Sequence, residues 1–343
     1  MNRKQQVAVF TGIIISLAFL WFAFRDLRPK QVIDEIEQAS IPLLFVGAAW
    51  YFAAVSIITL RWQYLLRQVK VVPLRSLIPL VCIGYMGNNV YPFRSGEALR
   101  IFLLRRDHGV PVVKATTTVI VERVFDGLVM LTFIVIPLSL TDIASDDVQR
   151  VVTFAAPLFL SALAVFFALA AKPSILRLLT KYGSRFLPSR LAGLVQRISE
   201  EIIDGLEGLR SPSDLAGAVI ASYVTWAVEA SVYWIVMLAF NIDSGYLVAL
   251  MVVGTVNLAG LLPASPGMVG VFEFFARVVL VAAGIAEELA AGYAVTVHLV
   301  IWLPVTVVGF TFLVRQGLGW SAITSAYQLE QQVAGLQDVP AKE

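Results

Sequence analysis

The sequence predicts an all-α polytopic membrane protein, with about six to eight transmembrane helices and two re-entrant helical hairpins in opposed orientation. Composition gives the class, because 58% of the 343 residues are hydrophobic and only 15% are charged. The mean hydropathy of +0.80 is too high for a soluble globular chain. The hairpins are predicted from two stretches in which turn-forming and charged residues interrupt an apolar run. The single cysteine, Cys82, excludes an intrachain disulfide.

Two predicted spans open the chain. Residues 7–24 form an apolar run of about 18 residues, and no small-residue cleavage site follows, so we expect an uncleaved span. Residues 43–60 form the second span. It is followed by the basic residues Arg61, Arg67, Lys70 and Arg75. Because short loops rich in Lys and Arg remain on the cytoplasmic side, we place this loop and the N-terminus in the cytoplasm.

The stretch that follows is too short for an ordinary span. Residues 77–90 would extend roughly 21 Å as a helix, against a hydrocarbon core of about 30 Å. If they crossed the membrane, the next arginines would lie outside, against the charge rule. We therefore predict that residues 77–106 form a re-entrant hairpin that enters and leaves from the cytoplasm. Its turn is marked by Asn88, Asn89, Pro92, Ser95 and Gly96.

This turn also carries charge. Arg94, Glu97 and Arg100 are three residues apart, so they share one face if the segment after Ser95 is helical. A guanidinium matches phosphate oxygens through two parallel hydrogen bonds, which makes Arg94 and Arg100 candidate ligands of an anionic head group. The alternative is an ordinary cytoplasmic loop with a basic flank.

The next span, residues 115–138, contains Glu122, Arg123 and Asp126. Ionisable residues are costly in hydrocarbon, and they face a bundle interior or a cavity where a partner offsets the charge. Glu122 and Asp126 are four apart and share a face, whereas Arg123 points about 100° away and needs a partner on another helix or on a substrate. The alternative is that all three lie about one turn from the interface and snorkel toward it.

The middle of the chain contains an acidic loop and the longest polar segment of the sequence. Residues 142–150 form an acidic loop that we expect outside, and residues 154–171 return as a span. The longest polar segment, residues 172–214, is predicted to hold an amphipathic helix on the cytoplasmic surface. The residues that predict it recur at helical spacing: Leu194, Ile198, Ile202 and Leu206. The predicted organisation is one membrane domain, 1–315, with a first half 1–171, the connector 172–214, a second half 215–315 and a cytoplasmic tail 316–343.

The second half repeats the hairpin pattern. A span at 215–240 contains Glu229, and the run at 246–262 is broken from Pro263 onward. Asn257, Ser265, Glu273 and Arg277 follow the same order as Asn89, Ser95, Glu97 and Arg100. Paired broken segments in two halves indicate a transporter site at the interface between repeats, so we predict a second hairpin that enters from outside. Two full spans, 246–262 and 268–285, are the alternative. A last span covers 290–314.

Three motifs carry a resemblance to a known family. They are N-x-x-P-x-R-x-G-E-x-x-R at residues 89–100, E-R-x-x-D at 122–126 and P-x-S-P-G-x-x-G-x-x-E at 263–273. In this order they resemble the flippase-like membrane domain of lysylphosphatidylglycerol synthase, also called multiple peptide resistance factor. The resemblance covers roughly residues 5–315. It implies the handling of lipids in a cytoplasmic membrane, and the soluble synthase domain has no counterpart in the residues after Arg315.

We expect a lipid flippase of the cytoplasmic (inner) membrane with both termini in the cytoplasm. Its cargo would be an anionic or aminoacylated phospholipid or a polyprenyl-linked lipid. The alternatives are a membrane-embedded partner of a separate lipid synthase or glycosyltransferase, and an enzyme that modifies lipid head groups. We expect no enzyme activity, cofactor or metal, because the sequence lacks a nucleotide-binding loop, and its two histidines lack neighbours at metal-ligand spacing. Membrane lipids are the expected partners, without nucleic acid, and a homo-oligomer is left open.

The candidate substrate-binding residues are Asn89, Arg94, Glu97, Arg100, Glu122, Arg123, Asp126, Glu229, Asn257, Ser265, Glu273 and Arg277.

Overall fold

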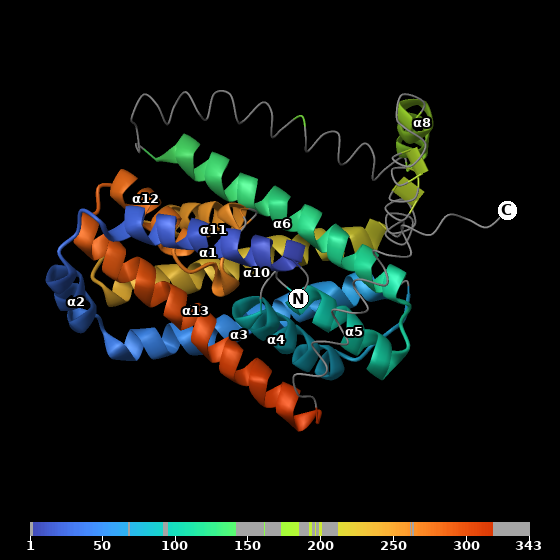
Figure 1. Cartoon of the computed structure of the whole chain (residues 1–343), viewed down its shortest axis with the longest axis horizontal. Coiled ribbons are helices and arrows are strands. Elements are labelled where there is room, and N and C mark those ends of the chain that lie inside the picture. Colours follow the sequence, from blue (N-terminus) through green and yellow to red (C-terminus); the bar gives the residue numbers. More distant parts are fainter. Residues whose placement is uncertain are drawn as a thin grey trace.

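The computed structural model describes residues 3–67, 69–91, 95–141, 161, 173–184, 192–193, 196, 199–200, 212–260, 262 and 264–317. In this part of the chain, every element of regular secondary structure is a helix (Figure 1). In chain order they are α1 (Arg3–Phe24), α2 (Pro29–Gln38), α3 (Ile41–Leu66), α4 (Leu74–Val90), α5 (Gly96–His108), α6 (Val112–Leu140), α8 (Pro173–Gly183), α10 (Pro212–Ala239), α11 (Tyr246–Ala259), the 3-10 turn η3 (Pro266–Met268), α12 (Val271–Ala282) and α13 (Glu287–Arg315).

Several predictions concern residues that the structure does not describe. They are the acidic loop at 142–150, the span at 154–171 apart from Ser161, Arg94, the connector residues Leu194, Ile198, Ile202 and Leu206, and the tail beyond residue 317. Within the connector, α8 is an amphipathic helix, as expected for a helix that lies on a surface.

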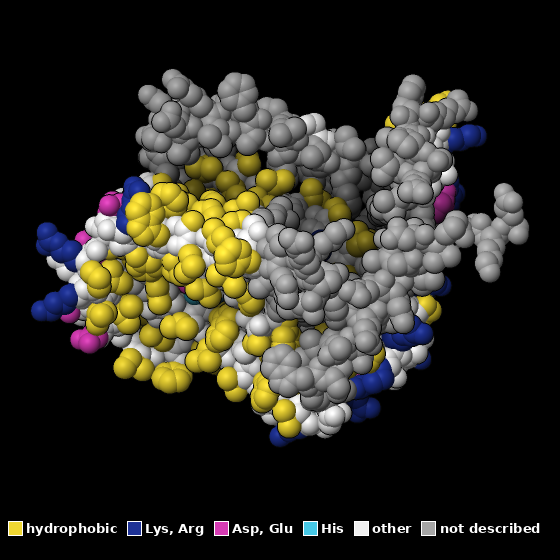
Figure 2. All heavy atoms as spheres, in the orientation of Figure 1, with side chains coloured by type: hydrophobic (Ala, Val, Ile, Leu, Met, Phe, Trp, Pro, Cys, Tyr) yellow, Lys and Arg dark blue, Asp and Glu magenta, His cyan; other side chains and the backbone are white. Residues whose placement is uncertain are grey.

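The predicted class is confirmed, because the chain is a multi-pass membrane protein and its described residues contain helices as their only regular secondary structure. Three described helices are long and apolar enough to cross a membrane: α3, α10 from Ala216 onward, and α13. A fourth is added if α1 and α2, bent by 82°, are counted as one span. Figure 2 shows hydrophobic side chains spread over the middle of one face, with charged side chains gathered toward the two ends of the long axis. Such a distribution suits a bundle surrounded by lipid.

Helix α3 differs from its prediction in a way that matters for function. The expected span ended at Leu60 and left Arg61 in a basic loop, but the helix continues to Leu66. Arg61 is therefore inside the bundle, with a side chain that is 1% exposed. Its removal from the loop leaves Arg67, Lys70 and Arg75 as the basic flank. Helix α2 was not predicted either. It begins with Pro29, which suits the first turn of a helix, and buries Val32.

Helices α4 and α5 form the first predicted hairpin. Their outer ends lie together, because Lys70, just before α4, donates to the carbonyl of His108 at the end of α5 over 2.6 Å. The inner turn is closely packed at Gly96. A Cβ on this residue would lie 1.8 Å from the Gly84 carbonyl oxygen, and its N–H donates to Asn88 Oδ1 over 3.0 Å. Only glycine fits where two backbones approach this closely.

Helices α11 and α12, joined through η3, form the second hairpin. With 14 and 12 residues, they extend about 21 Å and 18 Å. Neither length reaches across a hydrocarbon core of about 30 Å, which argues against two full spans. The outer end of α12 is held to α1, because Arg277 donates to the carbonyl of Ala23 over 3.0 Å and pairs with Glu287 at the start of α13.

The two hairpins open at opposite ends of the bundle. At one end the N–H of Ser40, before α3, donates to the carbonyl of Ala239, and the second hairpin starts just beyond this point. At the other end Arg106 of the first hairpin contacts Gln316, just after α13, over 2.8 Å. The tips meet between these ends. A Cβ on Gly267, which has φ +69°, would lie 3.2 Å from the carbonyl oxygen of Asn89.

Candidate functional site

A buried arginine organises the charged residues of α6. Arg61 Nη2 lies 2.6 Å from Glu122 Oε1, and Arg61 Nη1 lies 2.5 Å from Asp126 Oδ1. Asp126 Oδ1 also accepts a hydrogen bond from Trp226 Nε1 of α10 over 2.7 Å. The prediction that Glu122 and Asp126 share a face is confirmed, since one guanidinium reaches both. A positively charged partner from α3 accounts for two buried carboxylates on α6.

Arg100 extends this arrangement to the first hairpin. Its Nη2 lies 2.9 Å from Glu122 Oε2, and its guanidinium carbon lies 4.3 Å from the centre of the Trp62 ring. Trp62 is fixed in turn by a 3.2 Å hydrogen bond from Nε1 to Thr118 Oγ1. Arg100 is thus held by a carboxylate and an aromatic face, both from the protein. Arg100 therefore joins α5 to α6 through a structural contact.

Arg123 is the most accessible member of the group. Its Nη2 lies 3.0 Å from Glu97 Oε1 on α5, and its Nη1 lies 3.3 Å from Asp126 Oδ2. The prediction that Arg123 needs a partner on another helix is confirmed by Glu97. The side chain is 39% exposed, against 1% for Arg61. We call these six residues the ion-pair cluster: Arg61, Glu97, Arg100, Glu122, Arg123 and Asp126.

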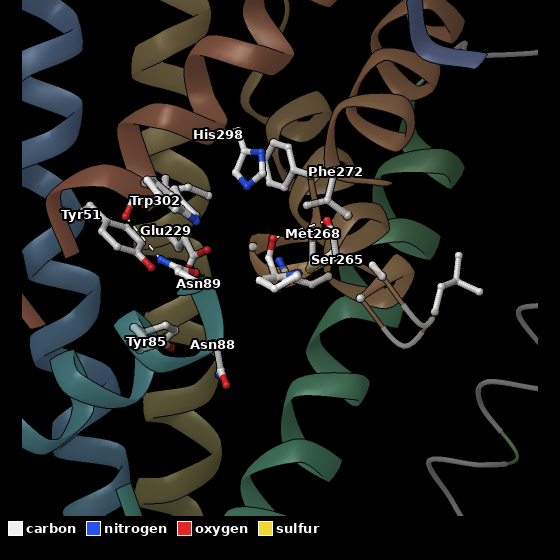
Figure 3. Close-up of a pocket in the computed structure, with 18 of the residues that line it drawn as sticks. Tyr51, Tyr85, Asn88, Asn89, Glu229, Ser265, Met268, Phe272, His298 and Trp302 are labelled. Atoms are coloured by element: carbon white, nitrogen blue, oxygen red, sulfur yellow. Dashed lines mark hydrogen bonds between the residues drawn. The ribbon is translucent and has the colours of Figure 1, made fainter. Parts of the chain in front are cut away.

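A cavity of about 480 Å³ adjoins the cluster at the point where the two hairpin tips meet. Figure 3 shows that Asn89 from α4, Glu229 from α10, and Ser265 and Met268 from the second tip surround one space. Arg123 also lines this cavity, so it joins the cluster to the cavity. Aromatic side chains make up much of the wall: Tyr51, Tyr85, Trp226, Tyr233, Phe272 and Trp302. The volume is in the range of small-ligand sites.

Polar atoms on the cavity wall lack partners in the described part of the chain. Arg123 Nε and Trp302 Nε1 are buried N–H donors without a hydrogen-bond acceptor. Buried donors are normally paired, so each unpaired one needs an explanation. Glu229 lines the same cavity, is 5% exposed, and makes no hydrogen bond or ion pair with any described residue.

The first tip is held to α13. Asn89 Nδ2 donates to Thr306 Oγ1 over 2.8 Å and approaches the carbonyl oxygen of Trp302 at 3.4 Å. Asn88 uses its Oδ1 for the Gly96 N–H. The predicted site residue Asn89 therefore lines the cavity and also fixes the hairpin tip.

The residues predicted from the second hairpin divide into two groups. Asn257 and Ser265 line the cavity. Glu273 accepts the Gly270 N–H over 2.6 Å at the start of α12, and it contacts His298 Nδ1 at 2.6 Å. Arg277 lies at the outer end of α12 on the end of α1. The structure gives Glu273 and Arg277 contacts that hold helices together.

The structure thus brings together nine of the twelve predicted residues in the cluster or on the cavity wall. They are Asn89, Glu97, Arg100, Glu122, Arg123, Asp126, Glu229, Asn257 and Ser265. Arg94 lies outside the described residues. Arg61 was missed. The signal that could have revealed it is the apolar sequence Trp62, Tyr64, Leu65 and Leu66, which continues the helix beyond Arg61. In the described ranges, no group of three or more His, Cys, Asp and Glu side chains could hold a metal ion.

Comparison with known proteins places this geometry in context. Residues 9–309 match the family described as lysylphosphatidylglycerol synthase TM region. The chain is 23% identical over 337 residues to Glycosyltransferase AglD of Haloferax volcanii, covering 89% of this chain and 54% of that protein. This chain therefore spans about half the length of that relative. Two UPF0104 membrane proteins of Methanothermobacter thermautotrophicus are 22% and 25% identical and match over 94% of their lengths, covering 90% and 92% of this chain.

Proposed function

Because the chain belongs to the lysylphosphatidylglycerol synthase TM region family, we propose that it is a flippase-like transporter that moves a lipid with an anionic head group across the cytoplasmic membrane. In this proposal both hairpins are re-entrant, the first from the cytoplasm and the second from outside. Both termini then lie in the cytoplasm. The lipid class includes anionic and aminoacylated phospholipids and polyprenyl-linked lipids, all of which carry a phosphate.

One observation carries the proposal. The two hairpin tips meet at a cavity of about 480 Å³ that is lined by Arg123 and Trp302, and each of these side chains has a buried N–H donor without an acceptor among the described residues. Donors of this kind suit the oxygen atoms of a phosphate, and the guanidinium adds a charge. Non-helical backbone at membrane depth is tolerated where it lines such a cavity. Inverted hairpins around a central site are the arrangement expected for alternating access.

A second candidate has a specific observation in its favour. The similarity to Glycosyltransferase AglD covers 54% of that protein. A membrane-embedded partner of a glycosyltransferase or lipid synthase is therefore the alternative, in which this chain binds the lipid for another enzyme. A head-group-modifying enzyme is a third class. It is less favoured, since the described cavity wall holds one carboxylate, Glu229, and one guanidinium, Arg123, and the hydroxyl of its serine, Ser265, is hydrogen-bonded to backbone carbonyls and not to a base.

The test is lipid movement in proteoliposomes that contain labelled phosphatidylglycerol. The transporter proposal predicts movement of the intact lipid, the partner alternative predicts binding without movement, and the enzyme alternative predicts a changed lipid. Arg123→Lys retains charge but loses the planar fork, and Trp302→Phe removes one donor. Each should lower the rate about tenfold, the scale of a charged hydrogen bond of roughly 1.5 kcal/mol.

The matched controls are Arg105→Lys and Trp21→Phe, since both side chains are exposed and lie away from the cavity. Equal rates in the cavity variants and the controls would show that the cavity donors do not bind the transported lipid.

A further inference from the structure

We propose that Glu229 is a proton-binding site, through which a proton and an anionic lipid cross the membrane together. The inference rests on the proposed function and adds the coupling ion to it. Glu229 lies near the middle of α10, with 5% of the residue exposed. Figure 3 shows its side chain directed into the cavity, toward the space enclosed by Asn89 and the second hairpin tip. A buried carboxylate in a span requires a compensating group.

Titratable or charged groups lie near Glu229 on five helices, α3, α4, α6, α10 and α13. They are Tyr51 and Arg61 from α3, Tyr85 from α4, Arg123 and Asp126 from α6, Tyr233 on α10 itself, and His298 from α13. Helix α11 contributes Asn257, which does not titrate. The two arginines of this set are already paired with carboxylates, and His298 is paired with Glu273. No described residue is left to balance the charge of Glu229.

The formal charges at the site indicate why Glu229 would bind a proton when an anionic lipid enters. The ion-pair cluster holds three guanidinium groups and three carboxylates, so its formal charge is balanced. An ionised Glu229 would add one negative charge to the cavity that receives the anionic head group. Like charges repel strongly where water is excluded. A proton on Glu229 removes this repulsion, and the negative charge of the lipid then replaces that of Glu229, so loading leaves the net charge of the site unchanged.

The coupled step is balanced in charge. On one side of the membrane the carboxylate of Glu229 takes up one proton as one monoanionic lipid enters the cavity. On the other side the lipid leaves, and the O–H bond of the carboxyl group breaks to release the proton. The transported pair is electrically neutral. A pH gradient therefore drives the movement, whereas a membrane potential does not.

Calorimetry on the full-length protein in detergent tests the coupling directly. Short-chain phosphatidylglycerol is titrated at one pH in two buffers with different ionisation enthalpies, which gives the number of protons taken up per lipid bound. We expect about one proton for the wild-type protein and for Glu229→Asp, which retains a titratable group, and close to zero for Glu229→Gln. The control is Glu37→Gln on exposed α2, which should match the wild type.

Vesicles supply the second measurement. A gradient of one pH unit should shift the steady-state distribution of phosphatidylglycerol by up to about tenfold, because one proton accompanies each lipid, and an imposed potential should have no effect. Binding of the lipid by the wild-type protein without proton uptake would overturn the inference, even if Glu229→Gln fails to fold. Absence of both binding and movement would overturn the proposed function, and the coupling with it.

Discussion

At the scale of single residues, the pairing of Arg61 explains how two carboxylates are tolerated on a buried face of α6. Glu122 and Asp126 both contact its guanidinium, and all three side chains are at most 9% exposed. A buried ion pair brings little net stability relative to apolar residues, because desolvation offsets the attraction. Removal of one partner is costly, however, since the remaining charge stays buried and unpaired. The cluster is therefore sensitive to single changes and tolerant of paired ones.

Replacement of Arg61 tests this account. We expect Arg61→Met to lower the free energy of unfolding by about 3–5 kcal/mol, since Glu122 and Asp126 lose their shared cation. The added change Asp126→Asn should restore part of the loss, because Glu122 keeps Arg100 at 2.9 Å. The measurement is thermal unfolding in a mild detergent, with Arg67→Met beyond the end of α3 as the control. Similar stability of Arg61→Met and Arg67→Met would refute the structural role of the ion pair.

Two carboxylates of the ion-pair cluster could be identified from the sequence, but their partner Arg61 could not. Glu122 and Asp126 stood out, because charged residues are rare within an apolar run. Arg61 did not, since an arginine after an apolar run and before Arg67 and Lys70 is typical of a cytoplasmic flank. The two carboxylates already required a cation. Its identity depends on which helix packs against α6, and no local pattern contains that information.

At the scale of elements, the first hairpin depends on close approach between its two helices. The Cα of Gly96 faces Gly84 and Asn88, and a Cβ there would overlap the Gly84 carbonyl oxygen. The N–H of Gly96 also supplies the hydrogen bond that closes the turn onto Asn88. A side chain at this position would force α4 and α5 apart. Their separation would move Glu97 and Arg100 away from α6.

Two alanine substitutions separate packing from helix propensity. Gly96→Ala should destabilise the protein by several kcal/mol, roughly the cost of overpacking plus a lost hydrogen bond, and should abolish lipid movement. Gly127→Ala on α6 is the matched control, because a Cβ there meets nothing within 4 Å. It should be neutral or stabilising by up to about 1 kcal/mol, since alanine favours the helix. Unfolding in detergent measures both, and equal stability would rule out the close approach.

Hairpins were predictable from the sequence because their helices are short and their turns are rich in Asn, Pro, Ser and Gly. The helix after Ser95 was also expected, and α5 begins at Gly96. The roles of Glu273 and Arg277 were not predictable from the repeat. Their order along the sequence matched them with Glu97 and Arg100 of the first hairpin. In the structure, however, Glu273 contacts His298 and Arg277 contacts the end of α1. A repeat in sequence need not repeat the contacts of each side chain.

At the scale of the whole molecule, the account depends on two hairpins that enter from opposite sides and meet at a central cavity. If both are re-entrant, the two outer ends of each hairpin lie on the same side of the membrane. Two full spans would leave the outer ends on one side as well, but α11 and α12, with 14 and 12 residues, are each shorter than a hydrocarbon core of about 30 Å. The sidedness of four positions therefore tests whether the two hairpins enter from opposite sides.

The most direct measurement of this claim is labelling of single cysteines in sealed vesicles with an impermeant thiol reagent, in a Cys82→Ala background. Arg75→Cys and Asp107→Cys mark the outer ends of the first hairpin, and Asp243→Cys and Ala286→Cys mark those of the second; all four positions are exposed. We predict that the first pair reacts only from the cytoplasmic side and the second pair only from the outside. Reaction of Arg75→Cys and Asp243→Cys from the same side, or of the two members of either pair from different sides, would contradict the opposed hairpins.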